Sequence, residues 1–586
     1  MRKWWMIGML MFGYCTISKG QDLSSVGQAN PLGINGSISI NQIGYGAIGI
    51  DSRRDPYSFF ASGGLTFNFY GWSVPLSFTY SNQEASFSQP FNQYSLSPTY
   101  KNYTGHFGYT SITFSPYTLS GHIFLGAGVE ASFEKWKASG MYGRLRKEVE
   151  PTAEAPESAV YRRIGYGGQA VYTNKGTTLD FSFFRGKDDV GSITFDQVDS
   201  VTVAPEENLV FSIGGTQQLF KKISLSINYA MSALTTDSRF GFQSLESNQL
   251  YNNLGSFFIV NGSTSFYDAV KVGTSYLGKS YTVGFRYERV DPGYTSHGAY
   301  YFVNDLENIT INGSKALLGG RMNLNASGGV QRDNLNGEKI STMERFVGDL
   351  SVGYTPSSRL NLTTSYSNFQ TFTNIQSQFV NINELTPFDN LDTLNFRQVS
   401  QSISANGNYM ISSSETRRQN AGLNVTLQEA KDEQGQTDQP TGNLFYLISG
   451  NYSINYIPQK VNGAVSFNYN RSTTADLVTE TLGPSVSLSK SLKENKMNVS
   501  MGLSWNQSRS DGVSQGSVTS LRLGGRYLWK EKHNFNLNLN TVNRSTPSTE
   551  TNGALDFTEI TATLGYSYSF SKSNFFNNKS KDTTTP

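Results

Sequence analysis

The chain has almost no cysteine, since Cys15 is the only one among its 586 residues. Beyond its N-terminal end it also lacks any apolar run close to the roughly 20 residues that a membrane-spanning helix needs. Cys15 lies in a segment that we expect to be removed, so the mature chain would have neither disulfides nor thiol chemistry. Helical insertion into a membrane is excluded for the same chain.

Charge is also scarce, at 16% of residues, and the mean hydropathy is −0.39. Glycine, serine, asparagine, threonine and aromatic residues make up the bulk, and no linker or change of composition divides the chain. One continuous architecture is therefore expected in spite of the length. The formal net charge is only +2, which argues against a nucleic-acid partner, because phosphates call for a strong basic excess.

The N-terminal end is typical of a secretory signal peptide. Arg2 and Lys3 precede an apolar run at 4–14, and small residues follow before Gln21. We expect residues 1–20 to be removed, which leaves 44 basic against 45 acidic residues. The alternative, a lipoprotein cleaved at Cys15, would place a large tyrosine where a small residue is needed.

Most of the remaining chain alternates between apolar and polar residues with a period of two. In 446–456 the tyrosines and isoleucines alternate with serine and asparagine, and 461–470 and 535–540 repeat the pattern. Strand side chains point alternately to opposite faces, and a barrel wall separates lipid from a wet lumen. A soluble β-sandwich would alternate too, so the pattern favours a membrane barrel without proving one.

Tight connections alternate with long ones, as in barrels with short periplasmic turns and longer extracellular loops. The tight ones fall near Gly71, Lys135, Lys175, Lys221, Gly278, Gly319, Ser357, Ser413, Gln459, Glu494 and Glu531. Eleven such turns predict an all-β, single transmembrane, antiparallel up-and-down barrel of about 24 strands, from 33–47 to 555–570. Aromatic residues and lysines beside three turns, at 70–72, 134–136 and 529–532, suit an interfacial girdle. The polar residues 571–586 are expected to form a flexible periplasmic tail.

One connection, residues 83–118, carries too much aromatic surface for a loop left in water. We hypothesise that it folds inward and narrows the lumen, with Phe87, Phe91, Tyr94, Tyr100, Tyr103, Phe107 and Tyr109 as the constriction. The alternative is an extra hairpin with a strand at 105–114, which would raise the count to 26 strands.

Charged residues at strand centres should face the lumen, because facing mid-bilayer lipid costs roughly 2–4 kcal/mol each. The predicted pore-lining residues are Arg144, Arg146, Arg162, Arg185, Arg286, Glu288, Arg522 and Arg526. If the basic members converge, they would favour anions. An equally good reading is that they are solvated or paired across strands.

Other motifs point to no chemistry. Residues 44–49 have the spacing G-x-G-x-x-G, but a loop follows in place of the helix that a dinucleotide site needs. His106, His122, His297 and His533 are scattered, without metal-ligand spacing or an orienting partner for catalysis. We therefore expect no cofactor, no metal and no enzymatic activity.

The octet 563–570 resembles the closing-strand signal by which the outer-membrane assembly machinery recognises barrels, with Thr563, Gly565, Tyr568 and Phe570 as its residues. With the Gln21 start and the Asn/Tyr/Ser-rich strands, the chain resembles the large, uncharacterised outer-membrane barrel proteins of the Bacteroidota. That resemblance implies the outer membrane, its lipid and the assembly machinery as location and partners. It departs from TonB-dependent receptors, since no plug domain fits between Gln21 and the first strand.

Two functions fit these observations. The first is a porin-like channel for small polar solutes, which the polar strand faces and the strand count favour. The second is a barrel subunit that anchors or helps to export a surface or secreted partner protein, with residues 83–118 and the long loops as its docking surface.

Overall fold

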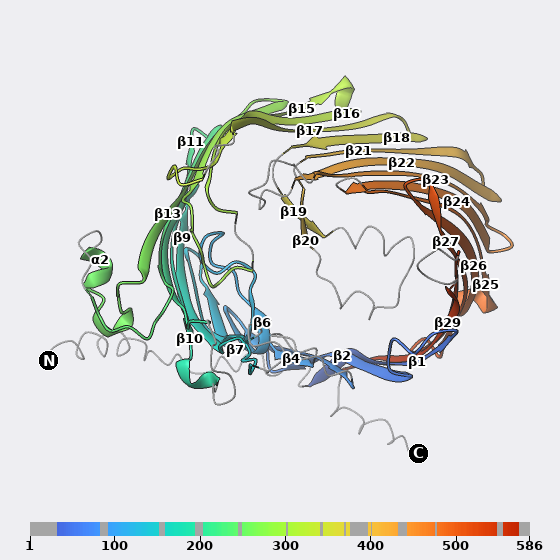
Figure 1. Cartoon of the computed structure of the whole chain (residues 1–586), viewed down its shortest axis with the longest axis horizontal. Coiled ribbons are helices and arrows are strands. Elements are labelled where there is room, and N and C mark those ends of the chain that lie inside the picture. Colours follow the sequence, from blue (N-terminus) through green and yellow to red (C-terminus); the bar gives the residue numbers. More distant parts are fainter. Residues whose placement is uncertain are drawn as a thin grey trace, which may run out of the picture.

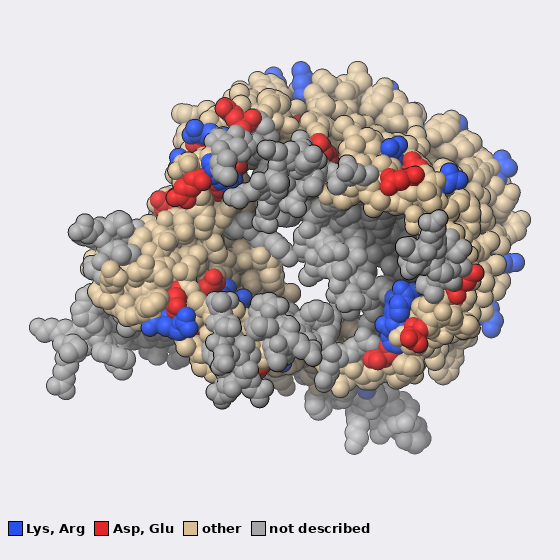
Figure 2. Space-filling model, viewed as in Figure 1, with Lys and Arg blue, Asp and Glu red and all other residues tan. Residues whose placement is uncertain are grey.

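The computed structural model describes residues 32–82, 92–151, 159–193, 203–243, 249–300, 303–339, 344–368, 371–374, 396–399, 401–431, 442–474, 477–547 and 555–573. The strands form a ring around a hollow centre (Figures 1 and 2). The predicted signal peptide with Cys15, and Phe87 and Phe91, lie outside the described residues.

Strands make up nearly all of the described structure. The strands of the ring are β1 (Gly33–Ile48), β2 (Tyr57–Phe69), β3 (Trp72–Ser81), β4 (Gln93–Leu96), β5 (Thr99–Tyr100), β6 (Tyr103–Ser111), β7 (Ile123–Ser132), β8 (Trp136–Arg146), β9 (Arg163–Asn174), β10 (Thr177–Asp188), β11 (Glu207–Leu219), β12 (Ile223–Thr235), β13 (Thr264–Leu277), β14 (Tyr281–Val290), β15 (Leu306–Leu317), β16 (Met322–Arg332), β17 (Glu344–Ser357), β18 (Leu360–Ser367), β21 (Gln401–Ser413), β22 (Arg417–Lys431), β23 (Gly442–Tyr456), β24 (Val461–Thr474), β25 (Leu477–Leu492), β26 (Met497–Ser510), β27 (Val513–Trp529), β28 (His533–Thr546) and β29 (Leu555–Ser573). Most are ten residues or longer, the length that a tilted membrane strand needs.

The remaining elements are short. A two-stranded sheet of β19 (Thr371–Asn374) and β20 (Phe396–Val399) is drawn inside the outline of the ring in Figure 1. The helical segments are η3 (Val190–Ser192), α2 (Gln249–Asn252), η4 (Gly255–Phe257), η5 (Leu318–Gly320) and η6 (Lys493–Asn495). Within the described ranges, no helix is long and apolar enough to cross a bilayer.

Each ring strand pairs antiparallel with the next, and β1 pairs with β29 to close the ring. The main sheet has 27 strands, but β4 and β5 lie end to end between β3 and β6, so the barrel has 26. The all-β antiparallel barrel is confirmed, with the higher of the two expected counts. The extra pair is the hairpin of β4–β5 with β6, within the segment 83–118.

Pro75 accounts for the break between β4 and β5. Leu76–Thr79 of β3 pair with β4, and Trp72 and Ser73 pair with β5. Proline has no N–H to donate, so the ladder cannot continue past it. Only the Pro75 carbonyl is used on this side, where it accepts from the Ser97 amide at 2.9 Å. A proline inside a long strand is thus accommodated by interrupting its neighbour.

The turns gather at one end of the barrel, and the long loops at the other. All eleven predicted tight turns are confirmed as connections between consecutive strands. A twelfth, at Lys101–Asn102, joins β5 to β6, and Lys101 adopts a positive φ of 52°. We call the end of the barrel that carries the tight turns the turn end, and the end that carries the long connections the loop end. At the close, β29 runs to Ser573, so residues 571–573 of the predicted tail belong to the wall, and its remaining residues, 574–586, lie outside the described ones.

The position of α2 identifies the outer face of the wall, because α2 lies outside the ring in Figure 1. Its segment packs Tyr251, Phe258 and Val260 on Leu209 of β11 and Ala233 of β12, so these last two face outward. Cross-strand partners share a face, so the assignment extends around the ring. The outer face carries exposed apolar residues, such as Val283 and Leu564, while the inner face is mainly serine, asparagine, threonine and glycine.

The closing strand matches the predicted assembly signal in position. Tyr568 and Phe570 lie on the outer face of β29, in line with Leu564. Gly565 lies on the inner face, where an added Cβ would come within 2.2 Å of Asn536 Oδ1 and 2.4 Å of Asn41 Oδ1. Glycine therefore lets the asparagines of both neighbouring strands close over it. Whether the assembly machinery reads these residues stays a prediction.

We expect Gly329→Val to destabilise the barrel by about 1–3 kcal/mol, the usual cost of overpacking. A Cβ at Gly329 would lie 1.9 Å from the Ile309 carbonyl oxygen, so β15 and β16 would have to move apart. The measurement is thermal unfolding in detergent, followed by loss of the compact form on unheated gels.

The matched control is Gly450→Val, because a Cβ at Gly450 meets nothing within 4 Å. Equal midpoints for the two variants would contradict the expectation.

Candidate channel lining and lumenal cover

The eight predicted pore-lining residues divide between the two faces and the loop end. Arg146, Arg286, Glu288, Arg522 and Arg526 lie on the inner face, by their pairing with inward-facing neighbours. Arg162 precedes β9 at the loop end, where its guanidinium pairs with Asp189. The prediction is wrong for Arg144 and Arg185, which face outward.

The outward arginines are tolerated because each is partnered near the loop end of its strand. Arg185 donates to Glu207 Oε1 at 2.8 Å and to the Tyr166 hydroxyl, with Phe257 of the outer α2 segment beside it. Arg144 lies 3.5 Å from the Tyr109 hydroxyl. We expected Arg185 to face the lumen because we assumed that lipid lies outside the wall at this position. Instead, the α2 segment covers Arg185 on the outside.

The aromatic constriction is a further correction. Tyr94, Tyr100, Tyr103, Phe107 and Tyr109 belong to the extra hairpin, and all five lie on the outer face of the wall. Tyr94 is 58% exposed and Tyr103 is 52% exposed, which is the pattern of outward apolar residues elsewhere in the ring. Their rings cannot narrow the lumen, since alternation places them on the opposite face.

An inward-folded element nevertheless exists, and it begins where the hairpin ends. Residues 112–122, between β6 and β7, and residues 291–300, between β14 and β15, pack together on the inner face. Tyr294 donates its hydroxyl to the Tyr117 carbonyl at 2.8 Å, and the Ser120 amide donates to the Gly298 carbonyl at 2.8 Å. We call these two segments the lumenal cover.

The cover rests on two apolar clusters. Ile112, Phe114 and Leu119 pack on the wall residues Phe124, Met141, Leu145 and Phe184. Tyr117 and Tyr294 pack on Val210, Ala230, Ala269, Val290 and Leu306. The cover thereby shields from water the apolar inner-face residues of β7 to β15, which would otherwise be exposed in the lumen. Buried apolar area of this kind makes the docked position the stable one.

A row of five glycines crosses the inner face of the wall from β6 to β10. Gly108, Gly126, Gly143, Gly165 and Gly186 are cross-strand partners from β6 to β10. An added Cβ at Gly186 would lie 2.7 Å from His297 Cβ, and one at Gly143 would lie 2.6 Å from the Phe124 ring. At Gly186 the missing side chain therefore lets the cover lie close to the backbone of the wall, whereas the other four glycines make room for neighbouring residues of the wall itself.

A buried ionic network ties the cover to the wall at the loop end. Asp188, 1% exposed, accepts from Arg163 at 2.7 and 2.9 Å and from Arg146 at 3.4 Å. Arg163 also donates to Glu206 at 2.7 Å, and His297 Nε2 of the cover lies 3.2 Å from the same carboxylate. Acidic and basic side chains thus neutralise each other here, as in several places around the ring in Figure 2.

The histidines that the sequence left scattered are partly brought together. His122 and His297 both belong to the cover, and His122 stacks on Tyr300 with ring centroids 4.0 Å apart. His106 pairs with Glu130 on the inner wall, and His533 lies at the turn end against Tyr566. No group of three or more metal-ligating side chains occurs in the described part of the chain.

Acidification is expected to loosen the cover, because the two groups that join it to the wall, the His297 imidazole and the Glu206 carboxyl, both have lowered pKa values. Burial lowers the pKa of the His297 imidazole from its ordinary 6.5. The contact with His297 and the charge of Arg163 lower the pKa of Glu206 to about 2. In both cases the released state takes up the proton first, so stability is lost as pH falls. His297 acts below 6.5 and Glu206 between 4.5 and about 2.

The measurement is hydrogen exchange of residues 112–122 and 291–300 from pH 7 to about 5, corrected for the intrinsic rate. We expect protection to fall in the native chain and to be nearly independent of pH in His297→Gln. Protection that rises on acidification would contradict the sign.

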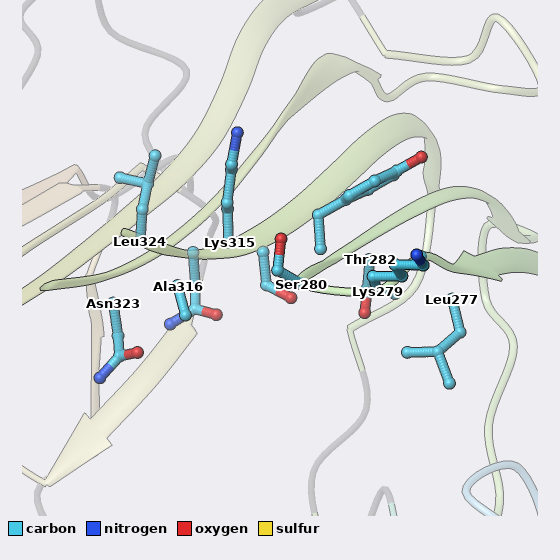
Figure 3. Close-up of a pocket in the computed structure, with 12 residues that line it drawn as sticks. Leu277, Lys279, Ser280, Thr282, Lys315, Ala316, Asn323 and Leu324 are labelled. Carbon is cyan, nitrogen blue, oxygen red and sulfur yellow. The ribbon is translucent and has the colours of Figure 1, made fainter. Parts of the chain in front are cut away.

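A groove of about 430 Å³ lies at the turn end beside the β13–β14 and β15–β16 connections. Figure 3 shows Lys315 and Leu324 pointing to one side of the strands and Asn323 to the other. A neighbouring groove of about 700 Å³ continues along the same strands between Val283 and Ile311, both outward-facing. The larger groove is lined mainly by outward-facing residues, whereas the smaller one is lined by residues of both faces beside the turns.

Comparison with known proteins found only distant structural likenesses. No family model and no curated protein matches the chain. Among solved structures, the FrpB iron transporter from Neisseria meningitidis is 10% identical, with 92% of this chain and 82% of that chain covered at a TM-score of 0.38. The PapC translocation pore of the P pilus usher is 9% identical (92% and 100% covered, TM-score 0.35), and OccAB2 of Acinetobacter baumannii is 9% identical (67% and 97%, 0.27). Likeness at this distance identifies neither a solute nor a partner.

Proposed function

We propose that the protein is a channel in the outer membrane that passes polar solutes. The observation that carries this proposal is the closed 26-strand ring with an apolar exterior and an interior of serine, asparagine and threonine. Closure leaves no strand edge unpaired, which a lipid environment requires. Barrels of 16–18 strands already enclose a wet channel, so this larger ring has room for one beside the lumenal cover.

The further parts of the proposal concern placement in the cell. Export by the signal peptide 1–20 and recognition of Thr563, Gly565, Tyr568 and Phe570 would deliver the chain to the outer membrane of a Bacteroidota-type cell. The turn end would then face the periplasm and the loop end the outside. Trp72, Trp136 and Trp529, exposed at the turn end, suit the inner interface of the membrane.

Recording from the pure protein in planar bilayers tests the channel. We expect discrete conductance steps, and liposomes that contain the protein should swell in neutral sugars up to a size limit. Sealed liposomes and silent bilayers with correctly folded protein would overturn the channel.

A second candidate, a barrel that anchors or helps to export a partner protein, is favoured by the strand number. Small solutes do not need 26 strands, and a lumen of this width can admit a protein segment. In that case the purified barrel alone would be silent, and a specific protein would co-purify from native membranes. Pull-down beside bilayer recording therefore separates the two.

A further inference from the structure

A groove crosses the outer face of the wall over β14, β15 and β16. Its volume is about 700 Å³, and outward-facing residues form most of its lining. Among the described atoms, an added Cβ at Gly313 of β15 would meet only the Thr282 carbonyl oxygen, at 3.5 Å, so no described side chain fills the space above this glycine. Val283 and Ile311, 47% and 63% exposed, lie beside it. The groove is therefore an apolar recess in the surface that faces lipid.

The recess continues to the turn end of the barrel. It shares part of its lining with the smaller groove of about 430 Å³ beside the β13–β14 and β15–β16 connections, and the shared residues are Tyr281, Thr282, Ser314, Lys315 and Leu324. Lys315 pairs with Tyr281 and Leu324 on the outer face, and Figure 3 shows Lys315 and Leu324 pointing to the same side of the strands. We call the two grooves together the outer groove.

The outer groove is basic where it reaches the turn end. Lys279 and Lys315 line this part, and neither forms an ion pair with a described acidic residue. The four turns from β11–β12 to β17–β18 contain no acidic residue, and their basic residues are Lys221, Lys222, Lys279, Arg321 and Arg359. A lysine stem can lie along apolar surface while its ammonium stays at the level of the lipid headgroups. This end thus offers positive charge at the height of lipid phosphates.

The length of the outer groove suits one leaflet of a bilayer. Lys315 and Ile311 are four residues apart on β15, which corresponds to roughly 13 Å at the usual rise of a strand. Half of the hydrocarbon core of a bilayer is about 15 Å thick. An acyl chain that lies along Gly313 would therefore place its headgroup beside Lys279 and Lys315.

Charge also favours a lipid over a second copy of this chain in the outer groove. A copy inserted in the same direction would bring its own turn end to the same height. The described turns there carry more basic than acidic residues, so two such ends would repel each other. An anionic lipid instead complements the two lysines, and this attraction contributes at short range near a membrane surface.

We propose that the outer groove is a binding site for one anionic glycerophospholipid. One acyl chain lies along Gly313 and the outward face of β16, and the phosphate lies at Lys279 and Lys315. The site rests on the placement of the wall in a bilayer and not on conduction through the lumen, so it goes beyond the proposed channel.

The test is native mass spectrometry of the full chain in detergent, titrated with phosphatidylglycerol or with phosphatidylcholine of the same acyl chains. We expect the native protein to retain one phosphatidylglycerol with a dissociation constant about tenfold below that of phosphatidylcholine. Lys279→Gln/Lys315→Gln should remove this preference, a loss of about tenfold for phosphatidylglycerol. The matched control is Lys460→Gln/Lys490→Gln, because Lys460 lies in a turn and Lys490 faces outward on β25 beside Val461. It should bind both lipids as the native chain does.

A second variant tests the apolar part of the outer groove. Gly313→Phe places a ring where the acyl chain would lie, and its Cβ makes only an ordinary contact, so the barrel should fold. We expect both lipids to bind about tenfold more weakly. Gly450→Phe is the control, since Gly450 also faces outward and an added Cβ there meets nothing within 4 Å. Its lipid binding should equal that of the native chain.

Three outcomes would overturn the site. The first is equal affinity of the native protein for the two lipids, and the second is an equal loss of binding in Gly313→Phe and Gly450→Phe. The third is a dimer or trimer that Gly313→Phe dissociates, which would assign the outer groove to a second copy. Conductance in planar bilayers is measured on the same variants and should not change. Silent bilayers would thus remove the channel and leave the lipid site standing.

Discussion

Replacing Gly298 with valine is expected to free the lumenal cover and raise the conductance of the barrel. A Cβ at this position would lie 2.6 Å from the Thr118 carbonyl oxygen and 2.9 Å from Leu119 Cα. Both are backbone atoms of the other cover segment, so no rotamer change relieves the contact. Overpacking of this kind costs about 1–3 kcal/mol, which shifts the docked-to-free ratio by about 5- to 150-fold.

The measurement is single-channel conductance together with hydrogen exchange of residues 112–122 and 291–300. Gly353→Val is the matched control, because it adds the same atoms to the inner face of β17 and meets nothing within 4 Å. Higher conductance and lower protection in Gly298→Val alone would support the cover as a partial obstruction. Loss of protection without any change in conductance would show that the cover lies beside the route of ions.

Replacing Asp188 with alanine is expected to destabilise the loop end of β9 to β11 by about 3–5 kcal/mol. The carboxylate is buried, and its loss leaves Arg163 and Arg146 facing each other without it. It also removes the acceptor of the Glu206 amide, 3.0 Å away. Asp188→Asn keeps the shape and an acceptor, so it should cost less. Thermal unfolding in detergent measures both.

The neighbouring residue supplies the control. Asp189 pairs with Arg162, but both side chains are about 40% exposed, so Asp189→Ala should cost less than about 1 kcal/mol. A double variant with Arg163→Met should recover part of the loss at Asp188, because an apolar side chain no longer needs the acid. Additive costs at the two positions would contradict the coupling.

Much of the wall could be predicted from the sequence because period-two alternation and turn chemistry are local. All eleven tight turns follow from them. The twelfth, at Lys101–Asn102, was missed because the short, proline-interrupted β4 and β5 hide the alternation of the segment that precedes it. The segment is rich in aromatic residues because they cover the outer face of a hairpin in the wall. The hypothesis of an inward-folded loop had no outer face on which to place them.

The faces of charged residues near the loop end could not be predicted. Arg185 can face outward because Phe257 and the α2 segment shield it from lipid. The sequence of β10 alone does not predict that contact. The cover escaped prediction for a similar reason. Tyr117 and Tyr294 are 177 residues apart, and each segment alone reads as an ordinary loop. The one sign of the cover in the sequence is an excess of small residues on consecutive strands, the glycines at 108, 126, 143, 165 and 186.

The long separation of the two cover segments has a consequence for biogenesis. Residues 112–122 can meet 291–300 only after the eight strands from β7 to β14 have taken their places, so these docking contacts belong to the late stages of assembly. Until then the glycine row and its apolar surroundings are hydrated, because the cover does not yet lie on them. A chain whose wall has closed before the lumenal cover has docked would be a late assembly intermediate, and we expect its permeability to differ from that of the mature molecule.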